Sequence, residues 1–136
     1  MKCEKTWGAI IFYNNQVLLV KQQKGFWGFP KGHVEDGETE VETAVREVKE
    51  ETNVDIVVEE NLRFENHYIT DTNIDKTVIF FVAHPIDNMN IIAQEVEIKD
   101  IKWIDIHKVE EKLTFDNLKE LWRTVYQEVI EKNVKI

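Results

Sequence analysis

Acidic side chains are concentrated in one short stretch of this 136-residue sequence. Nine Asp and Glu residues lie between Glu35 and Asp55, opposed only by Arg46 and Lys49. The stretch therefore has a net charge of −7, while the whole chain has −9. Repulsion among carboxylates costs free energy unless a cation lies among them. The stretch is a candidate metal-ion site, and the alternative interpretations are a solvated acidic surface and a contact with a basic partner.

Three of these carboxylates have a spacing that suits metal chemistry. On a helix that begins at Thr39, Glu47, Glu50 and Glu51 fall within an arc of roughly 100°, away from the apolar stripe. Convergent carboxylate oxygens suit Mg²⁺ or Mn²⁺, hard cations that keep water ligands and bind substrate phosphate. Arg46 can pair with the glutamates four residues away on either side, Glu42 and Glu50.

The elements that would position the acidic stretch begin with a β-hairpin. Residues 6–13 and 16–23 are rich in apolar residues and flank Asn14–Asn15, which tolerates positive φ. Residues 24–32 contain three glycines and a proline, which predict a loop without regular structure.

The acidic helix has clear predicted ends. Thr39 and Glu42 have the capping-box spacing, and Asn53 suits a left-handed helix end. After the helix we expect strands at 54–69, with a break at 59–61, at 76–86 after a turn-rich segment 71–75, and at 98–106. We also expect a short helix over 107–113 and a longer one after Thr114. This order predicts an α/β fold in which helices pack against a mixed sheet.

The bulk composition sets further limits. The length suits one domain over residues 1–136. Seventeen basic against 26 acidic residues argue against a duplex nucleic acid as partner. The single cysteine, Cys3, excludes an internal disulfide. No apolar run has the length of a signal peptide or of a membrane span. We therefore expect a cytoplasmic protein with no membrane partner.

The acidic stretch matches a known motif. Residues 32–54 resemble the Nudix box of the Nudix hydrolases, G-x5-E-x7-R-E-U-x-E-E-x-G-U, where U is an aliphatic residue. The match begins at Gly32 and includes Glu38. Every fixed position agrees except the last glycine, which is Asn53 here. After Gly, Asn is the next-best residue for a left-handed helix end. Asn53 can therefore still form the helix end that the motif requires.

The resemblance implies a Nudix fold, a mixed β-sheet sandwiched between α-helices, and hydrolysis of a nucleoside diphosphate linked to another group. It implies that Glu47, Glu50 and Glu51 are metal ligands and that Arg46 orients them. Gly32 would let the backbone turn near the metal. The identity of the general base varies among Nudix enzymes, and the sequence leaves it open.

A wider resemblance is to the asymmetric diadenosine tetraphosphate hydrolases of that superfamily. Residues 27–38, "WGFPKGHVEDGE", and 76–83, "KTVIFFVA", carry most of it. Residues 97–103 and 113–121 are weaker matches. This resemblance makes Glu97 a further metal ligand or catalytic carboxylate, with Glu95 as the competing choice.

The same resemblance assigns five substrate-binding residues. It implies that Lys31 and Lys76 contact the polyphosphate, that His33 lies beside it, and that Tyr68 and Phe115 sandwich a base. Ammonium groups neutralise phosphate, and aromatic faces stack on purines. Without the resemblance, Lys31 would be a solvated loop residue, Lys76 the end of a turn, His33 a partner of the loop backbone, Tyr68 a core residue and Phe115 a packing anchor.

These observations predict a Mg²⁺-dependent Nudix hydrolase, with Mn²⁺ as an alternative cofactor, that cleaves diadenosine tetraphosphate to ATP and AMP. The alternatives are a Nudix enzyme for a nucleoside triphosphate, a nucleotide sugar or the triphosphate end of RNA, and a nucleotide-binding regulator without turnover. A monomer and a homodimer both remain open.

Overall fold

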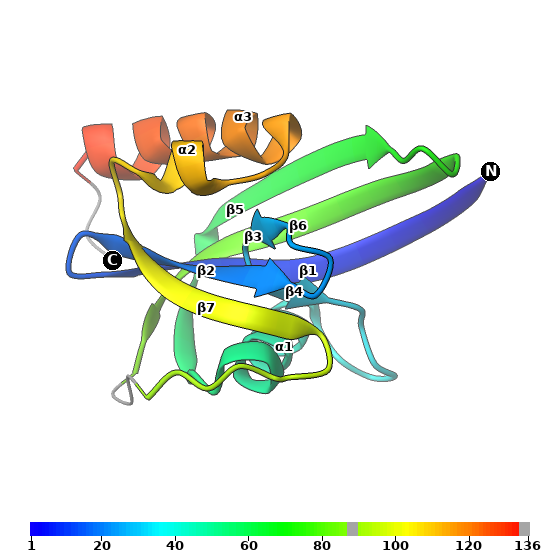
Figure 1. Cartoon of the computed structure of the whole chain (residues 1–136), viewed down its shortest axis with the longest axis horizontal. Helices are drawn as coiled ribbons and strands as arrows, with labels where there is room; N and C mark the ends of the chain where they lie inside the picture. Colours follow the sequence, from blue (N-terminus) through cyan, green and yellow to red (C-terminus); the bar gives the residue numbers. More distant parts are fainter. Residues whose placement is uncertain (87–89, 134–136) are drawn as a thin grey trace.

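A mixed β-sheet forms the centre of the molecule (Figure 1). The structure, a computed structural model, describes residues 1–86 and 90–133. The strand order is β3-β2-β1-β6-β5, while β4 pairs with β1 and β7 pairs with β2. The strands are β1 (Lys2–Tyr13), β2 (Gln16–Gln22), β3 (Trp27–Gly28), β4 (Lys31–Gly32), β5 (Ile56–Ile69), β6 (Ile74–Pro85) and β7 (Ile98–Asp105). The β1–β6 pair is parallel, and the other pairs are antiparallel.

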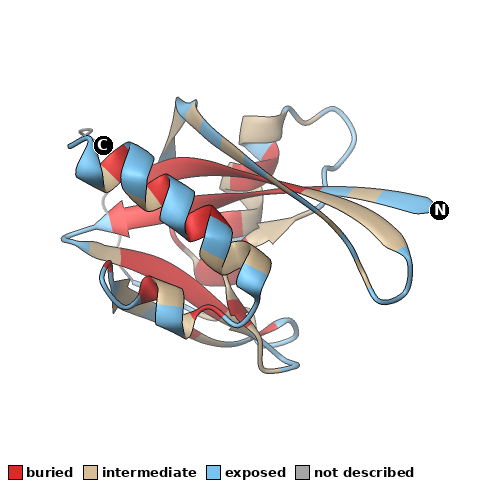
Figure 2. Ribbon diagram, turned by 90° about the horizontal axis from the view of Figure 1, so that it is seen from above, coloured by how far each residue is buried: buried red, intermediate tan, exposed pale blue. Residues whose placement is uncertain are grey.

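Helices cover both faces of this sheet (Figure 1). Helix α1 (Glu40–Thr52) lies on one face, while α2 (Val109–Lys112), α3 (Asp116–Val125) and the π-helix η1 (Tyr126–Glu131) lie on the other. Figure 2 shows the buried stripe along α3. That stripe, which includes Trp122, packs with Phe80 in one core cluster, and α1 places Val48 in another. The predicted α/β class with a mixed sheet between helices is confirmed.

The local predictions near the acidic helix are confirmed. Asn14 and Asn15 have positive φ values of 49° and 61° and connect β1 to β2. The Thr39 side chain accepts from the Glu42 N–H while the Glu42 carboxylate accepts from the Thr39 N–H, which completes the capping box. Asn53 ends α1 in the left-handed conformation, with φ of 67°.

Several predicted boundaries were wrong, because strand pairing between distant segments overrides local pattern. β1 begins at Lys2 rather than at residue 6, since parallel pairing with β6 extends it. The predicted loop 24–32 contains the short strands β3 and β4. The predicted break at 59–61 is a register shift inside the continuous strand β5. The last helix changes to a π-helix at Tyr126.

The helices within residues 1–86 and 90–133 do not include one that is long and apolar enough to cross a membrane.

Candidate active site

Arg46 is the centre of an ion-pair network on α1. Its Nε and Nη2 donate to the two carboxylate oxygens of Glu38, at 2.6 and 3.0 Å. Its Nη1 donates to Glu47 at 2.8 Å and to Glu50 at 3.1 Å, and Nη2 also donates to the His33 carbonyl at 2.7 Å. The hydrogen bond to Glu38 is the main cause of a raised Arg46 pKa. Arg46 thus ties the loop before α1 to the helix carboxylates.

One predicted partner of Arg46 was wrong. Glu50 contacts the guanidinium as expected, but the Glu42 carboxylate is used by the capping box at Thr39. The partner that the spacing argument missed is Glu38, which lies eight residues away across the turn into the helix. The bidentate Arg46–Glu38 pair is the strong, directional kind of charge-assisted hydrogen bond. The motif already contained the signal, because Glu38 is one of its fixed positions.

Gly32 is required by close approach rather than by a turn. A Cβ at this position would lie less than 3.0 Å from the Glu47 carboxylate. Positive φ values among the glycines occur at Gly25 and Gly37, so Gly32 does not need the freedom of a left-handed residue. The Glu47 carboxylate therefore lies against the backbone of β4, and any side chain at residue 32 would displace it.

Glu51 is a buried carboxylate at the inner end of this acidic group. Only 5% of the residue is exposed. Burial is the largest effect on its pKa, the charge of Glu47 adds to it, and together they raise the pKa of Glu51 to about 8. Burial also raises the pKa of Glu47, and the charge of Glu97 raises both values. These three carboxylates lie within electrostatic reach of one another and repel.

The donor set fits a divalent cation, although the present arrangement is not a preformed ligand cage. In the part of the chain that the structure describes, no three His, Cys, Asp or Glu residues are grouped closely enough to hold a metal ion. Arg46 engages Glu47 and Glu50, and the Glu50 side chain is 49% exposed. The expected convergence of all three helix glutamates is therefore not seen here. The fit rests on the repelling carboxylates Glu47, Glu51 and Glu97, because a hard cation would relieve their repulsion.

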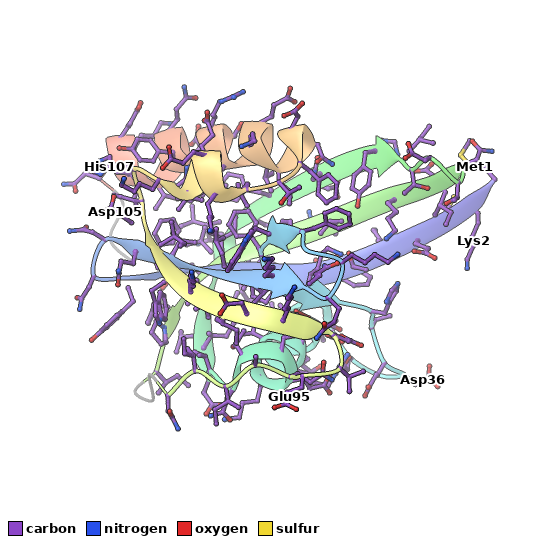
Figure 3. All side chains as sticks on the ribbon, in the orientation of Figure 1. Met1, Lys2, Asp36, Glu95, Asp105 and His107 are labelled. Atoms are coloured by element: carbon purple, nitrogen blue, oxygen red, sulfur yellow. The ribbon has the colours of Figure 1, made fainter. Side chains whose placement is uncertain are left out.

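The structure distinguishes Glu97 from Glu95 as the additional carboxylate of the site, which the sequence left open. Glu97 lines the same cleft as Glu47 and Glu51, whereas Glu95 lies outside that lining and points away from the body of the molecule (Figure 3). Gln23 binds this segment through two hydrogen bonds. Its side chain donates to the Glu95 carbonyl at 2.6 Å, and its backbone N–H donates to the Glu97 carbonyl at 3.1 Å. The geometry favours Glu97 as the additional carboxylate.

A cleft of about 1090 Å³ brings the remaining candidate residues together. Its lining contains the carboxylates of Glu47, Glu51 and Glu97 together with all five predicted substrate residues, which are Lys31, His33, Tyr68, Lys76 and Phe115. These residues come from β4, the loop after it, β5, β6 and the start of α3. Arg46 and Glu50 are not among the lining residues.

An acid that the sequence analysis missed, Glu4, lies beside the basic residues of the cleft. Glu4 on β1 lies 3.6 Å from Lys76 Nζ and 3.9 Å from His33 Nε2. Burial acts to raise the pKa of Glu4, but Lys2, Lys76 and His33 together hold it below its usual value. Burial is also the main cause of the lowered pKa of Lys31. No local pattern indicated Glu4, because the parallel register of β1 and β6 brings it to Lys76.

The aromatic part of the cleft contains a pair of rings in contact, Phe26 and Phe115, in addition to Tyr68. Phe115 is 45% exposed, and its ring centroid lies 4.9 Å from that of Phe26. Phe115 is therefore not the buried packing anchor that its position before α3 would suggest. Tyr68 is half-buried and packs against the core under α3. Phe26 is a further cleft residue that sequence analysis missed, since it lies in the loop between β2 and β3.

A mixed sheet between helices, with an acidic helix beside a glycine loop, is the arrangement expected for a Nudix protein. A family model described as "NUDIX domain" matches residues 4–124. The chain belongs to the Nudix family.

Individual relatives add detail within the family. The chain is 37% identical over 106 residues to Nudix hydrolase 2 of Arabidopsis thaliana, covering 71% of this chain but only 37% of that protein. It is 32% identical over 109 residues to the asymmetrical bis(5'-nucleosyl)-tetraphosphatase of Rattus norvegicus, covering 76% of this chain and 74% of that one. A crystal structure of a C. elegans Ap4A hydrolase binary complex has a TM-score of 0.81 at 23% identity, covering 94% and 98% of the two chains, and shows the shared fold.

Proposed function

We propose that this Nudix protein hydrolyses a nucleoside polyphosphate. The specific substrate that we propose is diadenosine tetraphosphate, which would be cleaved to ATP and AMP. The observation that carries the proposal is that three kinds of group line one cleft. The lining contains the carboxylates of Glu47, Glu51 and Glu97, the amino groups of Lys31 and Lys76, and the aromatic rings of Tyr68 and Phe115. Lys31 lies within electrostatic reach of Glu47, Glu51 and Lys76. The likeness in sequence to asymmetrical bis(5'-nucleosyl)-tetraphosphatases supports the same substrate class.

The chain's own residues would divide the work along the cleft. Phe115 and Tyr68 would stack on a base, and stacking contributes about 1–3 kcal/mol per base. Lys31 and Lys76 would neutralise the polyphosphate and hold it in line. An ionised carboxylate beside the attacking water would take the water's proton, and Glu47, Glu51 and Glu97 are the candidates in the cleft. Arg46 would hold Glu47 and Glu50 in place.

Mg²⁺, with Mn²⁺ as the alternative, is the proposed cofactor, held by Glu47, Glu50, Glu51 and Glu97 beside Gly32. When bound it would make water a better nucleophile and neutralise charge on the phosphoryl oxygens.

Domain extent and cellular location are also part of the proposal. Residues 1–136 would form one catalytic domain, and Cys3, the single cysteine, leaves no internal disulfide to require an oxidising compartment. We propose a cytoplasmic location. Size-exclusion chromatography with light scattering would distinguish a monomer from a homodimer.

The decisive experiment is product analysis. The full chain is incubated with Mg²⁺ and a panel of diadenosine tetraphosphate, nucleoside triphosphates, nucleotide sugars and RNA with a 5'-triphosphate, and the products are separated by chromatography. Equal amounts of ATP and AMP from diadenosine tetraphosphate, and loss of turnover with EDTA, are expected. Faster turnover of another substrate would place the specificity elsewhere in the family. Binding without turnover of any substrate would indicate a regulator.

A further inference from the structure

Glu4 is not one of the residues that line the cleft, but it places a negative charge beside Lys76 and His33, which do line it. Its Oε2 lies 3.6 Å from Lys76 Nζ and 3.9 Å from His33 Nε2, and its Oε1 lies 3.4 Å from Lys2 Nζ. Glu4 and Lys76 are direct partners in the parallel register of β1 and β6, so their side chains emerge on the same face of the sheet. The contact is therefore set by the fold and not by a flexible surface encounter.

The low exposure of the Glu4 and Lys76 side chains strengthens the electrostatic effect of the Glu4 charge. The Glu4 and Lys76 side chains are only 21% and 24% exposed. Charges that are partly removed from water are screened less than surface charges. An anion that approaches Lys76 or His33 would therefore experience repulsion from Glu4 as well as attraction from the Lys76 ammonium group.

The distances also show that Glu4 does not hold Lys76 or His33 by directional hydrogen bonds. Both separations exceed the usual length of an N–H···O hydrogen bond. Lys76 keeps its hydrogen-bond donors available for another oxyanion, and its position is set by the pairing of β6 with β1 and β5. Removal of the Glu4 charge would thus remove repulsion while leaving Lys76 in place.

We propose that Glu4 is an internal counter-anion that phosphate displaces from Lys76 and His33, and that it sets the affinity of the cleft for the polyphosphate part of its ligand. The proposal rests on the proposed function, in which Lys76 and His33 bind polyphosphate. Because Glu4 opposes substrate and product phosphate alike, it limits retention of the triphosphate product. Loss of its charge would tighten binding of both.

Calorimetric binding of inorganic tripolyphosphate to the full chain tests this without catalysis. For Glu4→Gln we expect a dissociation constant that is about threefold to tenfold lower than that of the wild type. This is the effect expected from removing one incompletely screened charge near the site. The difference should shrink at high salt. Glu4→Asp, which keeps the charge, should bind like the wild type. Glu60→Gln removes one exposed acid from β5 outside the cleft lining and controls for net charge.

The kinetic test separates this inference from the proposed function. With diadenosine tetraphosphate, Glu4→Gln should lower both KM and the inhibition constant of ATP by a similar factor, without raising kcat. Equal tripolyphosphate affinity in Glu4→Gln and Glu60→Gln, weaker binding in Glu4→Gln, or no binding to the wild type would overturn the role of Glu4. If no nucleotide is hydrolysed, the proposed function fails, and the tripolyphosphate comparison still decides the role of Glu4.

Discussion

The Glu47 carboxylate lies so close to the α-carbon of Gly32 that no side chain fits between them. Gly32→Ala should therefore displace Glu47 and lower kcat/KM by about 100-fold, the effect of a misplacement of about 1 Å at a catalytic group. The measurement is steady-state kinetics together with thermal unfolding. If Gly32→Ala lowers the melting temperature, the double variant Gly32→Ala/Glu47→Asp should restore it, because the shorter aspartate side chain leaves room for the alanine methyl group. A Gly32→Ala enzyme with wild-type kcat/KM would mean that Glu47 is not needed at this position.

The forked contact between Arg46 and Glu38 should matter more than the charge of Arg46. Arg46→Lys keeps the charge but cannot bind Glu38 bidentately while also contacting Glu47. We expect a fall in kcat of at least about tenfold. Arg63→Lys is the matched control, because Arg63 makes a similar two-nitrogen contact with Glu40 on the other side of α1. Equal activity losses in the two variants would assign the effect to stability.

Metal-free protein should lose stability as the pH rises through the range that Glu51 titrates. Its pKa is raised to about 8 in the folded chain, so the folded state binds this proton more tightly than the unfolded state. Stability therefore falls as the pH increases from about 4.5 to about 8. Thermal unfolding in EDTA across this range should show a decline that is smaller in Glu51→Gln. Parallel curves for the two proteins would contradict the burial effect.

Added Mg²⁺ should raise the melting temperature of the wild type, because a cation that binds only the folded state stabilises it by mass action. At a hundredfold excess over its dissociation constant the gain is about 2.7 kcal/mol. Glu50→Gln should reduce this gain and the activity together. Glu59→Gln on β5 is the control for charge alone. Full Mg²⁺-dependent turnover in Glu50→Gln would show that Glu50 is only a solvated residue.

The base-stacking role predicts a rise in KM with little change in kcat. Phe115→Ala and Tyr68→Ala should each raise KM for diadenosine tetraphosphate about tenfold, the equivalent of about 1.4 kcal/mol. Because Phe115 is 45% exposed, its truncation should cost much less stability than the ~3–5 kcal/mol of a core phenylalanine. An unchanged KM in a stable variant would remove that residue from the site.

The sequence by itself determined the features that depend on near neighbours along the chain. The Asn14–Asn15 turn, the capping box of Thr39 and Glu42, and the left-handed Asn53 each follow from residue types within a few positions. The same holds for Arg46 with Glu50, one helical turn apart. Helical spacing and turn chemistry are local, so they can be predicted without knowledge of strand pairing.

Only the tertiary structure decided which distant groups meet in the cleft. Glu4 reaches Lys76 through the parallel register of β1 and β6, and the Gln23 contacts hold the segment that presents Glu97. Phe26 meets Phe115 although 89 positions separate them in the chain. Close approach likewise explains Gly32, whose partner Glu47 lies on α1. Such contacts are set by strand order, register and burial, which arise from packing between segments far apart in the sequence.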